Sequence, residues 1–230
     1  MRKYEHIFFD LDHTLWDFSA NCAETLTDLY HRHHLDHLKI SLPDFITYYR
    51  QINDKMWDDL HQGKVTIEEV RNHRFARTFH MLGLQESDVP PGLDEQFISL
   101  CPTKSNVFPY THDILDYLSE RYVLHILTNG FRETQRTKLR SAGIEHYFQQ
   151  VIHSDESGFM KPDKRMFDYA LHVAGITAHQ CLMIGDDLYA DVLGAKNAGI
   201  DHVFVNRLDK QHQEVLTYEI DCLSTLKTFL

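Results

Sequence analysis

Two carboxylate residues follow the first apolar segment of the chain. Asp10 and Asp12 come directly after residues 7–9, a run of the length of a buried strand. Carboxylates this close repel one another unless a cation or a proton neutralises them. Their oxygens suit Mg²⁺, and a carboxylate can also attack phosphorus to form an aspartyl-phosphate. A second carboxylic acid can protonate a leaving alkoxide and then deprotonate water, so the pair is a candidate for phosphoryl transfer.

Further candidate residues share one feature, because each follows a later apolar segment of strand length. Open parallel sheets bind ligands outside the carboxyl ends of their strands, so we expect these residues to meet at one edge. An amine and backbone N–H groups there would hold a transferring group as its charge shifts. The candidates are Thr128, Asn129, Gly130, Lys161, Gly185, Asp186, Asp187 and Asp191.

The apolar segments alternate with amphipathic ones. Strands alternating with helices predict βαβ units and a parallel sheet, whose buried strands read as continuous apolar runs. We therefore predict an α/β, Rossmann-like core built from residues 1–15 and 105–230. The predicted strands include residues 7–9, 123–127, 151–152, 181–184 and 202–205, and the predicted helices cover 112–119, 132–142, 164–174 and 187–198.

Residues 16–104 break this alternation and read as helices throughout. Thr66 and Glu69 have the spacing of a capping box, and Gly83 has the position of a helix end. We predict an all-helical cap domain inserted after the first strand. Its predicted helices cover residues 18–35, 42–61, 66–82 and 93–100.

Four short segments resemble the motifs of the haloacid dehalogenase-like hydrolase superfamily. Asp10-Leu11-Asp12-His13-Thr14 resembles the first motif, DxDx[TV]. All four occur in order, each at a predicted strand end or in the expected loop. The other three are Leu127-Thr128-Asn129-Gly130 for the second motif, Lys161-Pro162 for the third, and Gly185-Asp186-Asp187 with Asp191, the pattern GDxxxxD, for the fourth.

The resemblance implies roles for the first pair of acids. It makes Asp10 the nucleophile and a metal ligand. It makes Asp12 the general acid and base, with a backbone carbonyl that also binds the metal. Dehalogenases of this superfamily lack the second aspartate, because displacing a halide needs no proton donor. The presence of Asp12 therefore favours phosphoryl transfer.

The same resemblance implies the groups that hold phosphate and Mg²⁺. Thr128 and Lys161 are expected to bind the phosphoryl group, together with the backbone N–H of Asn129. Asp186 is expected to be the metal ligand of the fourth motif.

Two more acids of the fourth motif are candidates for supporting the metal site. Asp187 stands where many members of the superfamily carry Ser or Asn, so it either ligates through water or caps a helix. Asp191 is expected to position other residues more often than to touch the metal.

A finer resemblance is to the pyrimidine 5'-nucleotidases of this superfamily. It implies hydrolysis of nucleoside monophosphates to nucleoside and phosphate, with a helical cap that sets specificity. Two alternatives stay open: a sugar phosphatase or phosphosugar mutase on the same scaffold, and a catalytically silent nucleotide-binding protein. The resemblance rests on residues 127–131, 161–171, 53–57 and 62–63.

Residues of the helical insert have less specific patterns. Asn53 is our candidate for contacting a nucleobase edge. Trp57, Met56 and Phe45 lie at helical spacing, so they either form the core of the insert or offer a ring for base stacking. The run at residues 31–37 is rich in histidine, and we interpret it as a solvated helix end rather than a zinc site.

Composition narrows the classes of partner and the cellular location that we expect for the chain. The 230 residues carry a formal net charge of −11, which argues against a nucleic acid polymer or an anionic membrane as partner. Four cysteines without a CxxC pattern and an N-terminus without signal-peptide features predict reduced thiols in a cytoplasmic protein. We expect a small-molecule phosphate monoester as the partner, and a monomer or weak homodimer.

Overall fold

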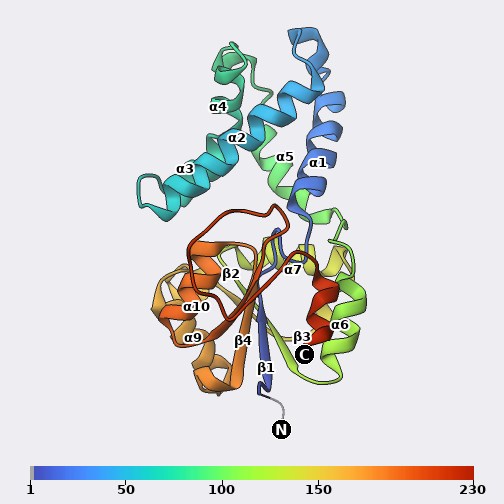
Figure 1. The fold of residues 1–230 in the computed structure, drawn as a ribbon. Helices are drawn as coiled ribbons and strands as arrows, with labels where there is room; N and C mark the ends of the chain where they lie inside the picture. The colour runs from blue at the N-terminus through green and yellow to red at the C-terminus, as the bar shows by residue number, and fades with distance from the viewer. Residues whose placement is uncertain (1–2) are drawn as a thin grey trace. The chain divides into compact units, whose positions relative to one another are not determined.

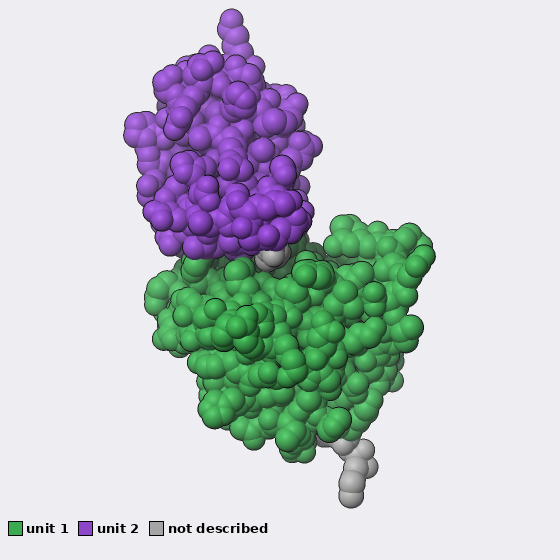
Figure 2. Space-filling model, turned by 90° about the vertical axis from the view of Figure 1, so that its left-hand side faces the viewer, with its two compact units in different colours: residues 1–18, 105–230 green, residues 19–104 purple. Residues whose placement is uncertain are grey.

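The computed structural model describes residues 3–230 and divides the chain into two compact units. One unit runs to Phe18 and resumes at Ser105, and the other covers Ser19–Lys104. Figure 2 draws them in green and purple. We call the first the α/β unit and the second the helical unit.

A six-stranded sheet organises the described part of the α/β unit. Its strand order is β3-β2-β1-β4-β5-β6, and every neighbouring pair is parallel (Figure 1). This confirms the predicted Rossmann-like parallel sheet, although the sequence did not predict the short edge strand β6. The strands are β1(His6–Phe9), β2(Val123–Thr128), β3(Phe148–His153), β4(Cys181–Gly185), β5(Asp201–Val205) and β6(Tyr218–Ile220).

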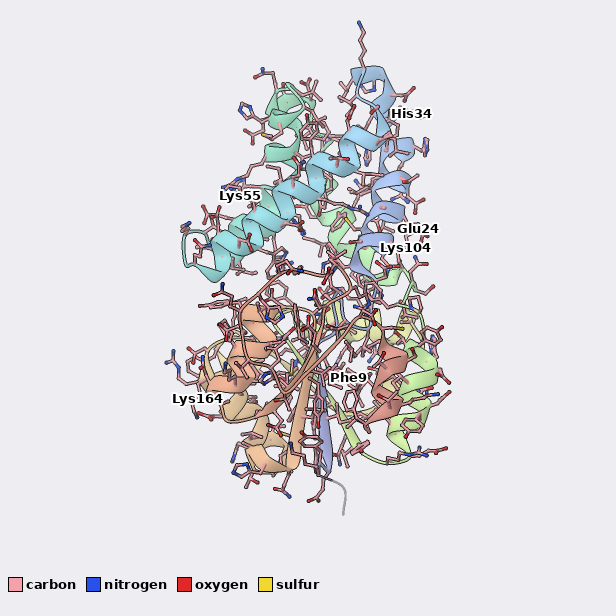
Figure 3. All side chains as sticks on the ribbon, viewed as in Figure 1. Phe9, Glu24, His34, Lys55, Lys104 and Lys164 are labelled. Atoms are coloured by element: carbon pink, nitrogen blue, oxygen red, sulfur yellow. The ribbon has the colours of Figure 1, made fainter. Side chains whose placement is uncertain are left out.

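The central strands are apolar because helices cover both faces of the sheet. In Figure 1, α9 and α10 lie on one face, and α6 lies on the other with the C-terminal segment η7. Phe9, labelled in Figure 3, is fully buried in β1. The helices are α6(Thr111–Ser119), α7(Arg132–Ser141), α8(Ser154–Ser157), α9(Lys164–Ala174) and α10(Gly194–Asn197), with the 3-10 segments η4(Glu145–Tyr147), η5(Ala178–Gln180) and η7(Leu223–Thr228).

The segment after β4 differs from the continuous helix predicted over residues 187–198. It consists of a π-helical segment, η6(Leu188–Leu193), followed by α10. The backbone N–H groups of Asp191 and Val192 both donate to the carbonyl of Asp187, at 3.0 and 3.2 Å, which widens the first turn. Single π-helical turns of this kind are frequent at functional sites.

Every regular element within residues 19–104 is helical. Thr66 and Glu69 form the predicted capping box, and Gly83 has the left-handed backbone (φ 79°) predicted for a helix end. The elements are α1(Phe18–Arg32), α2(Leu42–His61), α3(Ile67–Asn72), α4(Arg74–Met81) and α5(Leu93–Leu100), with the 3-10 segments η1(Leu35–Leu38), η2(Glu86–Asp88) and η3(Cys101–Thr103).

One predicted helix is broken in the structure. The helix expected over residues 66–82 divides at His73, whose dihedral angles (φ −124°, ψ 4°) are not helical. Asn72 and His73 both have modest helical propensity, so little local preference opposes a change of direction there. The amphipathic pattern continued through the break and therefore did not reveal it.

Aromatic packing holds the helical unit together. Phe45 is fully buried, and its ring centroid lies 6.2 Å from that of Phe75 and 6.1 Å from that of Phe79. Met56 is also fully buried, whereas Trp57 is half-buried. Phe45 and Met56 are therefore core residues of this unit.

Two further observations concern the thiols and the helices of the described residues. All four cysteines are free thiols, as predicted. Across the residues that the structure describes, no helix has both the length and the apolar character needed to cross a membrane.

Candidate active site

The sheet register brings the first and fourth motifs together. β1 lies between β2 and β4, with Phe9 paired to Ile126 and Ile184. The backbone N–H of Asp10 donates to the carbonyl of Ile184 at 2.9 Å, which extends this pairing by one residue. Asp186 follows the end of β4, so its backbone emerges at the same edge of the sheet.

Lys161 joins two of the predicted acids in the interior. Its Nζ donates to Oδ1 of Asp10 at 2.7 Å and to Oδ1 of Asp191 at 2.6 Å. A third hydrogen bond, to the carbonyl oxygen of Leu127 at 2.8 Å, uses its remaining donor. Lys161 is 2% exposed. Burial alone would lower the pKa of this amine, but the charges of Asp10 and Asp191 outweigh it and raise the pKa, so Lys161 stays protonated.

Three carboxylates gather around this lysine. Side-chain oxygens of Asp10, Asp186 and Asp191 all lie within 4.8 Å of one another. Thr14 lies between two of them, with Oγ1 3.3 Å from Oδ2 of Asp10 and 3.2 Å from Oδ1 of Asp186. One ammonium cannot balance three carboxylates, so the cluster has the charge and the hard oxygen ligands that suit a divalent cation.

The proton affinities of these acids reflect the crowding. Burial, followed by the charge of Asp10, raises the pKa of Asp186 to about 6. Burial also raises the pKa of Asp10 and of Asp191, against the lowering effect of Lys161. The cluster is therefore poised to bind a cation or a proton.

Asp12 has different partners. Nζ of Lys138 contacts both carboxylate oxygens of Asp12, at 2.6 and 2.7 Å, and Nε2 of Gln135 donates to Oδ2 at 2.9 Å. Burial would raise the pKa of this carboxyl, but the charge and hydrogen bonds of Lys138 and the hydrogen bond of Gln135 bring it below its usual value. Asp12 is therefore ionised in a salt bridge of its own.

The second motif borders both acids. Oγ1 of Thr128 accepts hydrogen bonds from Nε2 of Gln135 at 2.6 Å and from the backbone N–H of Gly130 at 3.1 Å. The side chain of Asn129 accepts from the backbone N–H of Lys161 at 2.7 Å and donates to its carbonyl at 3.0 Å. The amide of Asn129 thus holds the loop that delivers the lysine.

Asp187 has a local role in the structure. Its Oδ1 accepts from the backbone N–H groups of Tyr189 and Ala190, at 2.8 and 2.7 Å, so it caps η6. It lies outside the group of three carboxylates described above. Asp191, in contrast, lies inside that group and also accepts from the backbone N–H of Asp187 at 3.1 Å.

The sequence prediction missed two residues of this site, Gln135 and Lys138. They lie three apart on α7, so they share one face of a helix that begins soon after the second motif. Their position on one face of the helix after the second motif was the signal that could have identified them from the sequence. The helix is polar on all sides apart from Leu139, so its pattern gave no reason to bury these two side chains.

The candidate residues of the helical unit make side-chain contacts within that unit. Asn53 is buried, and its Oδ1 accepts from Nη1 of Arg74 at 3.2 Å. His33 contacts Oε1 of Gln96 at 3.0 Å. Within residues 3–230, neither His33 nor His37 joins a group of three or more side chains close enough to hold a metal ion.

Comparison with known proteins assigns this arrangement to a family. The model of the haloacid dehalogenase-like hydrolases matches residues 4–199. Pyrimidine 5'-nucleotidase PynA of Streptococcus pneumoniae is 35% identical over 231 residues, spanning 96% of this chain and 95% of that protein. Pyrimidine 5'-nucleotidase YjjG of Escherichia coli is 30% identical over 231 residues, spanning 99% and 98%.

A solved structure extends the similarity to three dimensions. The HAD-hydrolase YfnB from Bacillus subtilis, bound to magnesium, superposes with a TM-score of 0.87 at 30% identity, covering 99% of this chain and 98% of that one. The resemblance seen in the four motifs is thereby confirmed. This chain belongs to the haloacid dehalogenase-like hydrolases.

Proposed function

We propose that this enzyme hydrolyses pyrimidine nucleoside monophosphates to nucleoside and phosphate through an aspartyl-phosphate on Asp10. It is a phosphoric monoester hydrolase, as its family and its full-length similarity to two pyrimidine 5'-nucleotidases indicate. One observation carries the mechanism: the two acids of the first motif have separate cationic partners, Lys161 for Asp10 and Lys138 for Asp12.

Asp10 is the proposed nucleophile. Its carboxylate attacks phosphorus, the bond between phosphorus and the ester oxygen breaks, and the phosphoryl group is transferred to Asp10. Lys161 stays protonated beside it and can pair with the phosphoryl oxygens. The hydroxyl of Thr128 and the backbone N–H of Asn129 are the proposed further contacts of this group.

Asp12 is the proposed acid and base. Its carboxyl gives a proton to the leaving oxygen and later takes one from the water that hydrolyses the phosphoaspartate. It must first take up that proton, and the negative charge of a phosphoryl group beside it favours the protonated form. The salt bridge with Lys138 describes the enzyme before that uptake.

Mg²⁺ is the proposed cofactor. The carboxylates of Asp10 and Asp186 and the backbone carbonyl of Asp12 are the proposed ligands, and Asp191 completes the acidic surroundings. When bound, the ion neutralises charge on the phosphoryl oxygens. The related YfnB structure, which is bound to magnesium, supports this choice.

The helical unit is the proposed cap, and we assign to it the selection of the leaving nucleoside. The support is the similarity to both nucleotidases, which extends through this unit because it spans nearly the whole chain. The pyrimidine preference rests on this similarity, whereas the phosphoryl chemistry rests on the site itself.

A hydrolysis screen tests both parts. Uridine, thymidine, cytidine and adenosine monophosphates and hexose phosphates would each be assayed for free phosphate, with Mg²⁺ and with EDTA. We expect turnover that needs Mg²⁺ and favours the pyrimidine nucleotides. Product analysis also separates hydrolysis from a mutase reaction, which would isomerise a hexose phosphate without releasing phosphate.

The matched variants are Asp10→Asn and Asp168→Asn. Asp168 pairs with Lys164 on the surface of α9, so its variant controls for the loss of a carboxylate. We expect Asp10→Asn to lose turnover and Asp168→Asn to keep it. Full activity of Asp10→Asn would overturn the mechanism, and a preference for hexose phosphates would overturn the substrate alone.

A further inference from the structure

We infer that Lys138 and Gln135 are positioning residues for Asp12, holding its carboxyl beside the phosphoryl-binding hydroxyl of Thr128 so that it can protonate the leaving group. The inference rests on the proposed function, since it needs Asp12 to act as the acid. Neither residue belongs to the four motifs by which the family was recognised.

Lys138 is a largely buried lysine that pairs with one carboxyl group. Its side chain is 7% exposed, an unusual burial for a lysine. Its Nζ contacts both oxygens of Asp12 and lies 4.7 Å from the ring centroid of Trp16 and 5.8 Å from that of Phe18. Aromatic faces and a carboxylate thus surround the ammonium, and two short contacts restrain the rotation of the Asp12 side chain.

Gln135 ties that carboxyl to the second motif. It is fully buried, and its Nε2 donates both to Oδ2 of Asp12 at 2.9 Å and to Oγ1 of Thr128 at 2.6 Å. The carboxylate and the hydroxyl are therefore bridged by a single amide nitrogen. Because Thr128 is the proposed phosphoryl contact, the bridge places Asp12 next to the bond that breaks.

The backbone of the second motif makes room for this amide. A Cβ added at Gly130 would lie 2.2 Å from Nε2 of Gln135, far inside van der Waals contact. Only a glycine at this position lets the side chain of Gln135 reach Asp12 and Thr128 together. The glycine of the second motif therefore leaves the space that Gln135 needs to contact Asp12 and the phosphoryl-binding Thr128.

A purely structural role for Lys138 would be to neutralise a buried acid. Such a role predicts a loss that is independent of the leaving group. A positioning role predicts a loss that grows with the leaving group's need for a proton. A nucleoside leaves as a strongly basic alkoxide, whereas p-nitrophenol is a good leaving group without protonation, so the two substrates separate the roles.

The test compares kcat/KM, which reports the steps up to departure of the leaving group and not the later hydrolysis of the phosphoaspartate. It uses uridine monophosphate and p-nitrophenyl phosphate with Lys138→Met, Lys138→Arg and the surface control Lys164→Met. Lys164 is exposed on α9 and is labelled in Figure 3. Asp12→Asn supplies the reference pattern for loss of the acid. We expect Lys138→Met to lose about 10- to 100-fold with the nucleotide and only about 3-fold or less with the aryl ester. Lys138→Arg should recover much of the loss, because a guanidinium can also pair with both oxygens.

Each outcome bears on a different claim. Equal losses of Lys138→Met on both substrates, or no loss on either, would overturn the positioning role while leaving the proposed function intact. A wild-type enzyme inactive on both esters, or an Asp12→Asn variant that shows no dependence on the leaving group, would overturn the proposed function and this inference together. Melting temperatures of all variants show whether they are folded, and Lys138→Arg tests the role even if Lys138→Met does not fold.

Discussion

The two acids of the first motif are neighbours on the chain but have different surroundings. Asp10 and Asp12 are two residues apart, and each has a buried lysine as partner. Lys161 divides its charge between two carboxylates, one of which is Asp10. Lys138 donates hydrogen bonds to both carboxylate oxygens of one acid, Asp12. Burial raises the pKa of Asp10 in spite of Lys161, whereas the charge and hydrogen bonds of Lys138 outweigh burial and lower the pKa of Asp12.

The difference teaches how one short segment can support two roles. A carboxylate in a crowded acidic cluster gains from meeting a cation and an electrophile, as a nucleophile must. A carboxylate whose two oxygens pair with one lysine is held in one orientation, as a proton-transferring group must be. The partners come from separate parts of the chain, the segment between α8 and α9 and the helix α7. The Asp10 side, with Lys161, and the Asp12 side, with Lys138 and Gln135, can therefore be altered independently.

The largest effect on turnover is expected from removing the proposed nucleophile. Asp10→Asn keeps the size of the side chain and its place beside Lys161 but cannot form the aspartyl-phosphate. We expect kcat for nucleotide hydrolysis to fall by about 10⁴-fold or more, the usual scale for loss of a nucleophile. Phosphate release at a rate close to that of the wild type would place the nucleophile elsewhere.

Lys161→Met alters the Asp10 side without touching the Asp12 side. We expect kcat to fall by about 10²- to 10³-fold, because the phosphoryl group loses a preorganised cation. The loss should be similar for nucleotide and aryl esters, unlike the loss expected for Lys138→Met. A loss confined to the nucleotide would mean that the two lysines do not have the separate roles assigned here. Lys164→Met is again the surface control.

Two glycines allow a matched perturbation of the two sides. A Cβ at Gly185 would lie 2.1 Å from Oδ2 of Asp191, and a Cβ at Gly130 would lie 2.2 Å from Nε2 of Gln135. Gly185→Ala should displace a member of the acidic cluster, and Gly130→Ala should displace the bridge to Asp12. We expect kcat for the nucleotide to fall by about 10-fold or more in each, in line with the cost of small misplacements at a reacting site.

The two glycine variants should differ in their dependence on the leaving group. Gly185→Ala is expected to slow the nucleotide and p-nitrophenyl phosphate alike, whereas Gly130→Ala should slow the nucleotide more. The values of kcat/KM for both esters measure this contrast, because they exclude the shared hydrolysis of the phosphoaspartate. Identical profiles would show that the two sides are not separable in this way.

The smallest expected effect is on the thermal stability of the metal-free protein. The pKa of Asp186 is raised to about 6, so above that pH the folded protein carries a charge that the unfolded chain tolerates better. The penalty is present above pH 6 and is relieved as the pH falls towards the usual pKa of an aspartate, because the folded state then binds the proton more readily. Asp186→Asn removes the ionisable group and with it the penalty.

In EDTA at pH 7.5, Asp186→Asn should therefore melt higher than the wild type, by on the order of 5 °C. The gain should vanish near pH 4. Thermal melts across this pH range measure both effects. A variant that melts lower than the wild type at pH 7.5 would contradict the crowding described for the acidic cluster.

Much of the fold and of the Asp10 side could be predicted from the sequence for a physical reason. Strands buried on both faces must be apolar throughout, so β1, β2 and β4 appear as uninterrupted runs and the acids at their ends are easy to locate. Lys161 lies in a loop past the third predicted strand, where the strand pattern made it a candidate, and the resemblance to the family then assigned its role.

The Asp12 side could not be predicted in the same way. Gln135 and Lys138 are buried on a helix with almost no apolar residues, so periodicity does not mark their face as internal. Their burial comes from partners outside their own helix, Asp12 for both residues and Thr128 for Gln135. The π-helical turn after β4 was likewise hidden, because it depends on how the carbonyl of Asp187 is shared.

The central claim is that Asp10 carries the phosphoryl group and Asp12 moves the protons. The most direct measurement is rapid acid quenching of Asp12→Asn during turnover of p-nitrophenyl phosphate, followed by mass spectrometry of the peptide that contains Asp10. This substrate needs little protonation to react, whereas hydrolysis of the phosphoaspartate should be slow without Asp12. We predict that a phosphoryl group accumulates on Asp10 to a higher level than in the wild type. Continued release of phosphate with no phosphoryl group on Asp10 at any time point would contradict the account.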